Sequence, residues 1–234
     1  MMTHGEVIKS MTSVVFDIET LGFPLESFDS VQQEYLLKFA DTQEKREIEI
    51  QKFSLSPLTA RVIAIAMLNP ASMSGKVFYQ SDEKETYTSE DGKVEFVSGD
   101  EQEVIQKFWD NVKHYDRIVT FNGRAFDNPF LLIRSAIIGI RPTRNLMPYR
   151  YDSKEHCDLL EQLAFYGAVR KYNLDFYCKV FGIKSPKSEG ITGLDLGVLF
   201  HEKKFRKIAE YCLGDVIATA QLYMRWNEFL NIKD

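Results

Sequence analysis

The sequence has few cysteines, and they lack the spacing of a zinc site or a disulfide framework. Only three occur in 234 residues, and no two form a CxxC pair: Cys157, Cys178 and Cys212. An odd number of widely spaced cysteines argues against a disulfide-stabilised secreted domain and against a zinc ribbon. We therefore expect a protein of a reducing compartment, by default the cytoplasm.

Long apolar runs and an excess of positive charge are also missing. No stretch approaches the roughly 20 apolar residues of a membrane span, and the first residues lack the apolar core of a signal peptide, so we expect no membrane partner. Lys and Arg number 29 against 34 Asp and Glu, a net charge of −5. This balance argues against a protein held to nucleic acid mainly by bulk charge. It leaves open an enzyme that binds nucleic acid locally and releases it.

The remaining composition and pattern predict one α/β domain over residues 1–234, since no repeat or composition break divides the chain. Apolar runs predict strands at 13–19, 60–69, 75–81 and 116–123, with a short strand or turn at 155–159. Helical periodicity predicts helices at 31–42, 100–115, 126–140, 159–168, 173–183 and 205–230. The charged run 43–52 is compatible with a strand, and 82–100 and 184–193 read as loops. We expect a mixed sheet of five or six strands flanked by helices.

Two carboxylates stand at the end of the first predicted strand, in the stretch VVFDIETLG at 14–22. Residues two apart in a strand point to the same face, so Asp17 and Glu19 lie side by side. Like charges at this spacing repel, and their desolvation costs several kcal/mol or forces protonation. The pair therefore calls for a partner of opposite charge.

Two further acids can join this pair. Asp127 follows a predicted strand at a helix start, and Asp215 lies in the last helix with Tyr211 one turn earlier. Ligands of open α/β sheets bind beyond the strand ends, where these acids converge with Asp17 and Glu19. Carboxylate clusters suit hard cations such as Mg²⁺ and Mn²⁺. Two such ions about 3.5–4 Å apart can promote phosphodiester cleavage.

The stretches FDIET, FNGRAFDNPFL and YCLGD, in this order, resemble the three motifs of the DEDD 3′–5′ exonucleases, which have an RNase H-like fold. In particular, they look like the proofreading domain of B-family DNA polymerases and the stand-alone predicted exonucleases related to it. The resemblance covers about residues 13–230, with an insertion at about 23–58. One subclass has a histidine five residues before the last aspartate, which here is Glu210. The other, DEDDy, has a tyrosine four residues before it, as this chain does.

The resemblance implies a role for each acid. Asp17 bridges two divalent cations, Mg²⁺ or Mn²⁺, while Glu19 and Asp215 hold the first ion, which carries the attacking water. Asp127 reaches the second ion. Tyr211 orients the water rather than deprotonating it, because free tyrosine has a pKa of about 10.

The resemblance also implies substrate contacts. Thr20 and Leu21 match positions that meet the 3′-terminal nucleotide by backbone contact and apolar wedging. Asn122 and Phe126 line the cleft, with Phe126 as a candidate for base stacking. Arg124 is either a phosphate contact or a solvated loop charge.

Taken singly, each motif has a plainer interpretation. Asp127, like Asn128, can simply cap a helix, Asp158 suits the same role for the next helix, and a tyrosine four residues before an aspartate is commonplace. The ordered conjunction favours a metal-dependent 3′–5′ exonuclease acting on single-stranded DNA. A 3′–5′ exoribonuclease and a non-catalytic nucleic-acid-binding module of the same fold remain as alternatives, and a replication or repair partner stays open.

Overall fold

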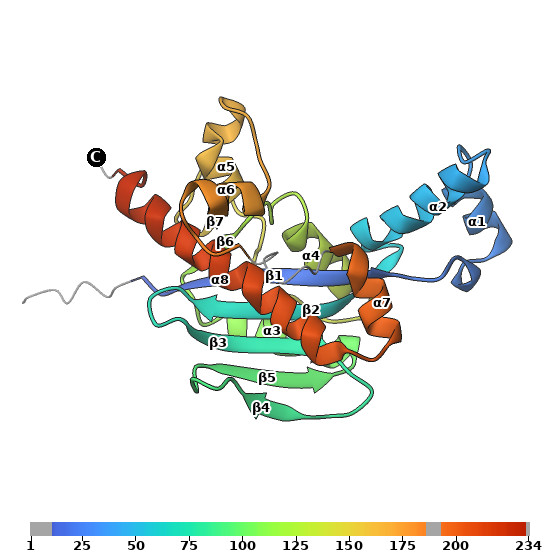
Figure 1. The fold of residues 1–234 in the computed structure, drawn as a ribbon, viewed down its shortest axis with the longest axis horizontal. Coiled ribbons are helices and arrows are strands. Elements are labelled where there is room, and N and C mark those ends of the chain that lie inside the picture. Colours follow the sequence, from blue (N-terminus) through green and yellow to red (C-terminus); the bar gives the residue numbers. More distant parts are fainter. Residues whose placement is uncertain (1–10, 186–192, 233–234) are drawn as a thin grey trace, which may run out of the picture.

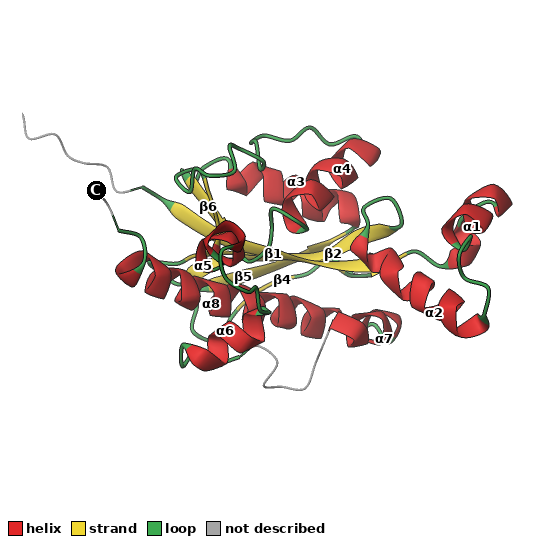
Figure 2. Cartoon of the chain, turned by 90° about the horizontal axis from the view of Figure 1, so that it is seen from above, coloured by secondary structure: helices red, strands yellow, loops and turns green. Residues whose placement is uncertain are grey.

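The structure is a computed structural model that describes residues 11–185 and 193–232. A mixed sheet of order β4-β5-β3-β2-β1-β6-β7 forms the middle layer. Figure 2 shows α3 and α4 over one face of this sheet and α6, α7 and α8 over the other. The predicted α/β class with a mixed sheet is confirmed.

The strands follow the apolar runs of the sequence, with these bounds: β1 Ser13–Gly22, β2 Ala60–Asn69, β3 Ser74–Gln80, β4 Thr86–Thr88, β5 Val94–Gly99, β6 Arg117–Thr120 and β7 His156–Asp158. Strands β2 and β3 form the expected antiparallel hairpin. Strand β1 pairs antiparallel with β2 and parallel with β6, which in turn pairs parallel with β7. The carboxyl ends of β1, β6 and β7 therefore meet at one edge of the sheet.

The sheet has seven strands, not five or six, because 82–100 is not the loop that its polar composition suggested. This segment contains the edge strands β4 and β5. Val94 and Phe96 of β5 are buried in the core, and Tyr87 of β4 stacks on Phe96 with ring centroids 4.6 Å apart. Two inward side chains and one ring were enough to fix a short edge that the surrounding charges concealed.

The helices have these bounds: α1 Ser30–Leu36, α2 Gln43–Gln51, α3 Glu101–Val112, α4 Asp127–Ile137, α5 Leu159–Leu163, α6 Leu174–Val180, α7 Leu196–His201 and α8 Phe205–Phe229. Two of the expected helices are shorter than predicted, at 31–42 and 159–168. The expected caps of α3 and α6 are confirmed, since Asp100 and Asn173 accept hydrogen bonds from backbone N–H groups of the first turns. Of the predicted loop 184–193, residues 186–192 lie outside the described residues.

The run 43–52 forms helix α2, and its interpretation as a strand is wrong. The two isoleucines that alternate with charges, Ile48 and Ile50, have no sheet to face, because this segment lies away from the strands (Figure 1). Thr42 caps the helix by accepting from the Lys45 N–H, and Gln43 bonds Glu47 one turn later. Local helical interactions therefore decide its structure.

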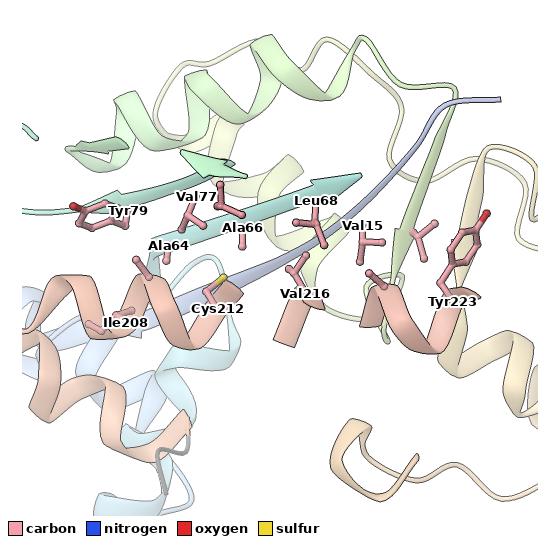
Figure 3. Close-up of a cluster of buried hydrophobic side chains, with 14 of the residues drawn as sticks. Val15, Ala64, Ala66, Leu68, Val77, Tyr79, Ile208, Cys212, Val216 and Tyr223 are labelled. Carbon is pink, nitrogen blue, oxygen red and sulfur yellow. The ribbon is translucent and has the colours of Figure 1, made fainter. Parts of the chain in front are cut away.

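Side chains from both faces of the sheet form the core. On the α8 side, the small residues Ala64 and Ala66 of β2 let Cys212 and Val216 of α8 pack closely (Figure 3). The other face packs larger side chains against α3 and α4, among them Phe16, Phe78, Phe108, Trp109 and Phe130. The close approach of α8 brings its middle turns against the carboxyl half of β1.

The insertion at 23–58 carries α1 and α2, which extend beyond the sheet in Figure 1. Its last segment, the 3₁₀ helix Lys52–Leu55, returns to β1, where the Thr20 hydroxyl donates to the Ser54 carbonyl at 2.7 Å. An apolar groove of about 600 Å³ lies between α1, α2 and this segment. Among the described residues, no helix has the length and apolar character that crossing a membrane requires.

Candidate active site

The end of β1 presents its two acids to α8. The pairing of β1 with β2 shifts register between Glu19 and Thr20, which marks an irregularity directly after the acids. Asp17 is half-buried, and Glu19 is only 9% exposed. The strand therefore holds both carboxylates within the protein rather than in open solvent.

Asp127 enters from α4 and is turned toward β1. Its carboxylate accepts the Ile18 N–H at 3.1 Å, and its side chain is 3% exposed. The cap of α4 is Phe126, without a side-chain hydrogen bond, so the expected capping role of Asp127 or Asn128 is wrong. The carboxylate is committed to the neighbouring strand, 109 positions earlier in the chain.

Asp215 and Tyr211 come from one face of α8, and both are half-buried. Asp215 raises the pKa of both Asp17 and Glu19 through charge repulsion, which places it near both. Burial raises the pKa of Tyr211 well above its usual range, and the nearby charges of Asp215, Glu19 and Asp17 raise it further. Four carboxyls and one phenol from β1, α4 and α8 thus converge in space.

Burial and mutual repulsion dominate the electrostatics of this cluster. Desolvation is the main cause that raises the pKa of Asp17 and of Glu19, and the neighbouring carboxylates add to it. Desolvation also raises the pKa of Asp127 to about 7. Within the described ranges, no lysine, arginine or histidine pairs with these three carboxyls. An oxygen-rich donor set without a cationic side chain fits divalent metal.

Cys212 lies beneath the acids, and sequence reasoning missed it. Ligand atoms of Asp17, Glu19 and Cys212 all lie within 4.8 Å of one another, and the buried thiol donates to the Asp17 carbonyl at 3.5 Å. Burial raises the pKa of this thiol well above its usual range, with further repulsion from both acids. Its position directly after Tyr211, one turn before the core residue Val216, was the available signal.

The predicted substrate residues have different surroundings. Thr20 is buried against the insertion, whereas Leu21 and Phe126 are half-buried and pack against the two core clusters on either face of the sheet. Asn122 follows β6 with φ of 65°, a left-handed conformation that asparagine tolerates better than most residues. These four residues border the strands that carry the acids.

Arg124 is held apart from the acids. Its Nη2 donates to the Pro148 carbonyl at 3.1 Å, and its Nε lies 3.5 Å from a Glu161 carboxylate oxygen. Only 12% of the Arg124 side chain and 8% of the Glu161 side chain are exposed. The guanidinium therefore belongs to a buried ion pair, and the acid that holds it was not identified from the sequence.

Asp158 fixes the loop that contains Asn122 and Arg124. Its carboxylate accepts the N–H groups of both residues, at 3.0 and 2.9 Å, and caps α5 by accepting those of Leu160 and Glu161. The expected capping role is confirmed, and the same carboxylate orders the segment that leads into Asp127.

Asp158→Ala should therefore destabilise the protein by about 3 kcal/mol, because buried N–H groups lose a charged acceptor. Urea unfolding measures this loss. Asp41→Ala is the matched control, because Asp41 pairs with Lys45 on the surface, and it should cost less than about 1 kcal/mol. Equal losses for the two variants would show that Asp158 does not order the loop.

The fold and the acidic cluster define an RNase H-like α/β domain of the exonuclease class. The chain belongs to a family described as predicted 3′–5′ exonucleases related to the exonuclease domain of PolB, whose family model matches residues 53–231. This range contains Asp127, Tyr211 and Asp215. It begins after Asp17 and Glu19, whose place in the site rests on their geometry.

Similar proteins include much longer polymerases. DNA polymerase 1 of Sulfurisphaera ohwakuensis is 26% identical over 177 residues, 69% of this chain and 19% of that protein. The DNA polymerase epsilon catalytic polypeptide of Emericella nidulans is 24% identical over 229 residues, 91% of this chain and 9% of that protein. The chain thus spans a fifth or less of these relatives.

A solved structure shares the fold. The family B DNA polymerase of the hyperthermophilic archaeon Pyrobaculum calidifontis superposes with a TM-score of 0.61 at 21% identity. The match covers 94% of this chain and 25% of that polymerase chain. The arrangement of sheet and helices is therefore that of a segment within a B-family polymerase.

Proposed function

We propose that this protein is a metal-dependent 3′–5′ exonuclease that releases nucleotides from the 3′ end of single-stranded DNA. The observation that carries the proposal is the convergence of four carboxyls from β1, α4 and α8, with burial raising the pKa of three of them. Such a cluster is costly unless cations occupy it. Membership of a family of predicted 3′–5′ exonucleases supports the same activity.

Asp17, Glu19, Asp127 and Asp215 would hold two divalent cations, Mg²⁺ or Mn²⁺, because carboxylate oxygens are the ligands these ions prefer. When bound, the ions lower the pKa of water and offset the charge that develops on the phosphodiester. The protein contributes position. The Ile18 N–H fixes the Asp127 carboxylate, and α8 carries Asp215 to the strand end.

Tyr211 would orient the attacking water. Its phenol stays protonated at neutral pH, because burial and the surrounding acids raise its pKa. A protonated phenol can donate one hydrogen bond and accept another, but it cannot act as a base. It therefore holds a water or a phosphate oxygen in place while the carboxylates provide the charge.

Tyr211→Phe should slow nucleotide release about 10- to 100-fold and leave Mn²⁺ affinity within about twofold, because only the hydroxyl is lost. Single-turnover digestion gives the rate, and titration calorimetry gives the Mn²⁺ affinity. An unchanged rate would show that the hydroxyl does not orient the reaction. A large loss of Mn²⁺ affinity would show a role in holding the site together.

The proposal is tested with a single-stranded DNA that carries its label at the 3′ or the 5′ end. Early release of labelled mononucleotide from the 3′-labelled strand, dependent on Mg²⁺ or Mn²⁺, is the expected result. A matched RNA strand separates the exoribonuclease alternative, which would need contacts to the 2′-OH. The names of the similar proteins, all DNA polymerases, favour DNA. No metal-dependent cleavage of either strand would leave only a binding module.

A further inference from the structure

Three exposed side chains form a stack beside helix α6. The rings of Tyr172 and Phe176 lie nearly parallel, with centroids 4.3 Å apart and an interplanar angle of 12°, and the Arg170 guanidinium lies 5.0 Å from the Tyr172 centroid. Tyr172 is 37% exposed and Phe176 is 47% exposed. We refer to these three residues as the outer stack. They are too exposed to be core, and they present aromatic surface to solvent.

The outer stack is joined to the candidate active site by a chain of rings. Tyr172 meets Tyr177 edge to face with centroids 6.2 Å apart, and Tyr177 meets Phe121 in the same way at 5.9 Å. Phe121 directly precedes Asn122, in the loop that leads to Asp127. The aromatic surface therefore begins at the end of β6 and continues outward.

Helix α6 also lies against the part of α8 that carries the acids. The two helices pack together, as Figure 2 shows. Cys178 of α6 is buried, and besides burial and Asp175, the charge of Asp215 raises its pKa. A strand leaving the acidic cluster on this side would pass over α6.

The charge around the outer stack is opposite to that of the chain as a whole. Residues 168–180 contain three basic residues and one acid, so their formal charge is 3 − 1 = +2, against −5 for the chain. The single acid, Asp175, pairs with Lys179 at 2.8 Å. The positive excess therefore lies at Arg170 and Lys171, beside Tyr172, where it attracts phosphates.

We propose that the outer stack binds single-stranded nucleic acid upstream of the 3′ end, with bases stacking on Tyr172 and Phe176 and phosphates near Arg170 and Lys171. The inference rests on the proposed function and extends it. Every base has a π face, so stacking tolerates any sequence, and a strand must be unpaired to stack in this way. The outer stack thus gives a physical reason for preferring single strands to duplexes.

The experiment compares a long and a short substrate in the double variant Tyr172→Ala/Phe176→Ala. Binding of a fluorescent oligothymidylate of about 16 nucleotides is measured by anisotropy with EDTA present, so that no cleavage occurs. Affinity should fall about tenfold or more, since two stacking surfaces are lost. Hydrolysis of the p-nitrophenyl ester of thymidine 5′-monophosphate with Mn²⁺ should stay within about twofold, because one nucleotide cannot reach the outer stack.

Two control variants make the result specific. Phe229→Ala removes an equally exposed ring, 59% exposed with Arg225 at 5.8 Å, about 21 Å along α8 from Asp215, and should change neither measurement. Tyr172→Phe/Phe176→Tyr keeps both rings and should retain oligothymidylate affinity. This second variant separates loss of the aromatic surface from damage to the fold.

The outcomes separate the two proposals. Unchanged oligothymidylate affinity in the alanine variant overturns the outer stack as a binding surface, as does the absence of saturable binding by the unaltered protein. If the unaltered protein hydrolyses neither substrate but binds oligothymidylate through the outer stack, the exonuclease proposal fails and this one stands. Equal loss of affinity in the ring-keeping variant also overturns it.

Discussion

Asp17→Ala should abolish metal-dependent nucleotide release, with a rate at least about 1000-fold lower than that of the unaltered protein, or about 4 kcal/mol in activation free energy. Asp17 is the acid that interacts with all the others, since Asp127, Asp215 and Glu19 each raise its pKa. Its loss removes the carboxyl common to the whole cluster. Release of labelled mononucleotide from a 3′-labelled single strand measures the effect.

Two further variants interpret this loss. Asp17→Asn keeps the shape of the side chain and removes its charge, so it should be nearly as inactive as Asp17→Ala. Glu90→Ala removes an exposed acid from the turn between β4 and β5 and should leave release unchanged. If Asp17→Ala retains more than about a tenth of the activity, the carboxyl cluster is not the catalytic centre.

Without metal, the protein should lose stability as the pH rises from about 4 to about 7. Burial raises the pKa of Asp127 from 3.8 to about 7. A carboxyl whose pKa is higher in the folded state stabilises the fold fully below its unfolded pKa, and this contribution is lost as the pH rises through the folded value. A shift of this size corresponds to at most about 4 kcal/mol.

Asp127→Asn isolates this effect, since the amide carbonyl can still accept the Ile18 N–H but carries no charge. In EDTA at pH 8, the variant should be more stable than the unaltered protein, and near pH 4 the two should agree within about 1 kcal/mol. Mn²⁺ should stabilise the unaltered protein more than the variant. Urea unfolding measures all three. A stability difference that is the same at pH 4 and pH 8 would contradict the buried charge at Asp127.

The sequence predicted the central layers of the fold because their residues are strongly patterned. Strand β2, ARVIAIAMLN, is buried along nearly its whole length, and α3 shows a clear apolar stripe. The edges were harder to predict. Strands β4 and β5 bury few side chains, and α2 carries isoleucines at an alternating spacing that its surroundings do not use. Tertiary context decided these segments.

Residues of the candidate site were predictable where a motif lay on a regular element. Asp17 and Glu19 follow from strand alternation, and Tyr211 and Asp215 follow from helical spacing. Side-chain direction in loops was not predictable. Arg124 turns to Glu161, 37 positions later in the chain. The outer stack likewise depends on how α6 packs against β6 and α8, which no local pattern encodes.

The most direct test of the central claim is a crystal of the protein soaked in Mn²⁺, with the anomalous scattering of the ion used to locate it. We predict a peak within bonding distance of the Asp17 carboxylate and of at least one further carboxylate among Glu19, Asp127 and Asp215. The same peak should be absent from crystals of Asp17→Ala. Saturating Mn²⁺ with no peak at these carboxylates would contradict the claim that they form a divalent-metal site.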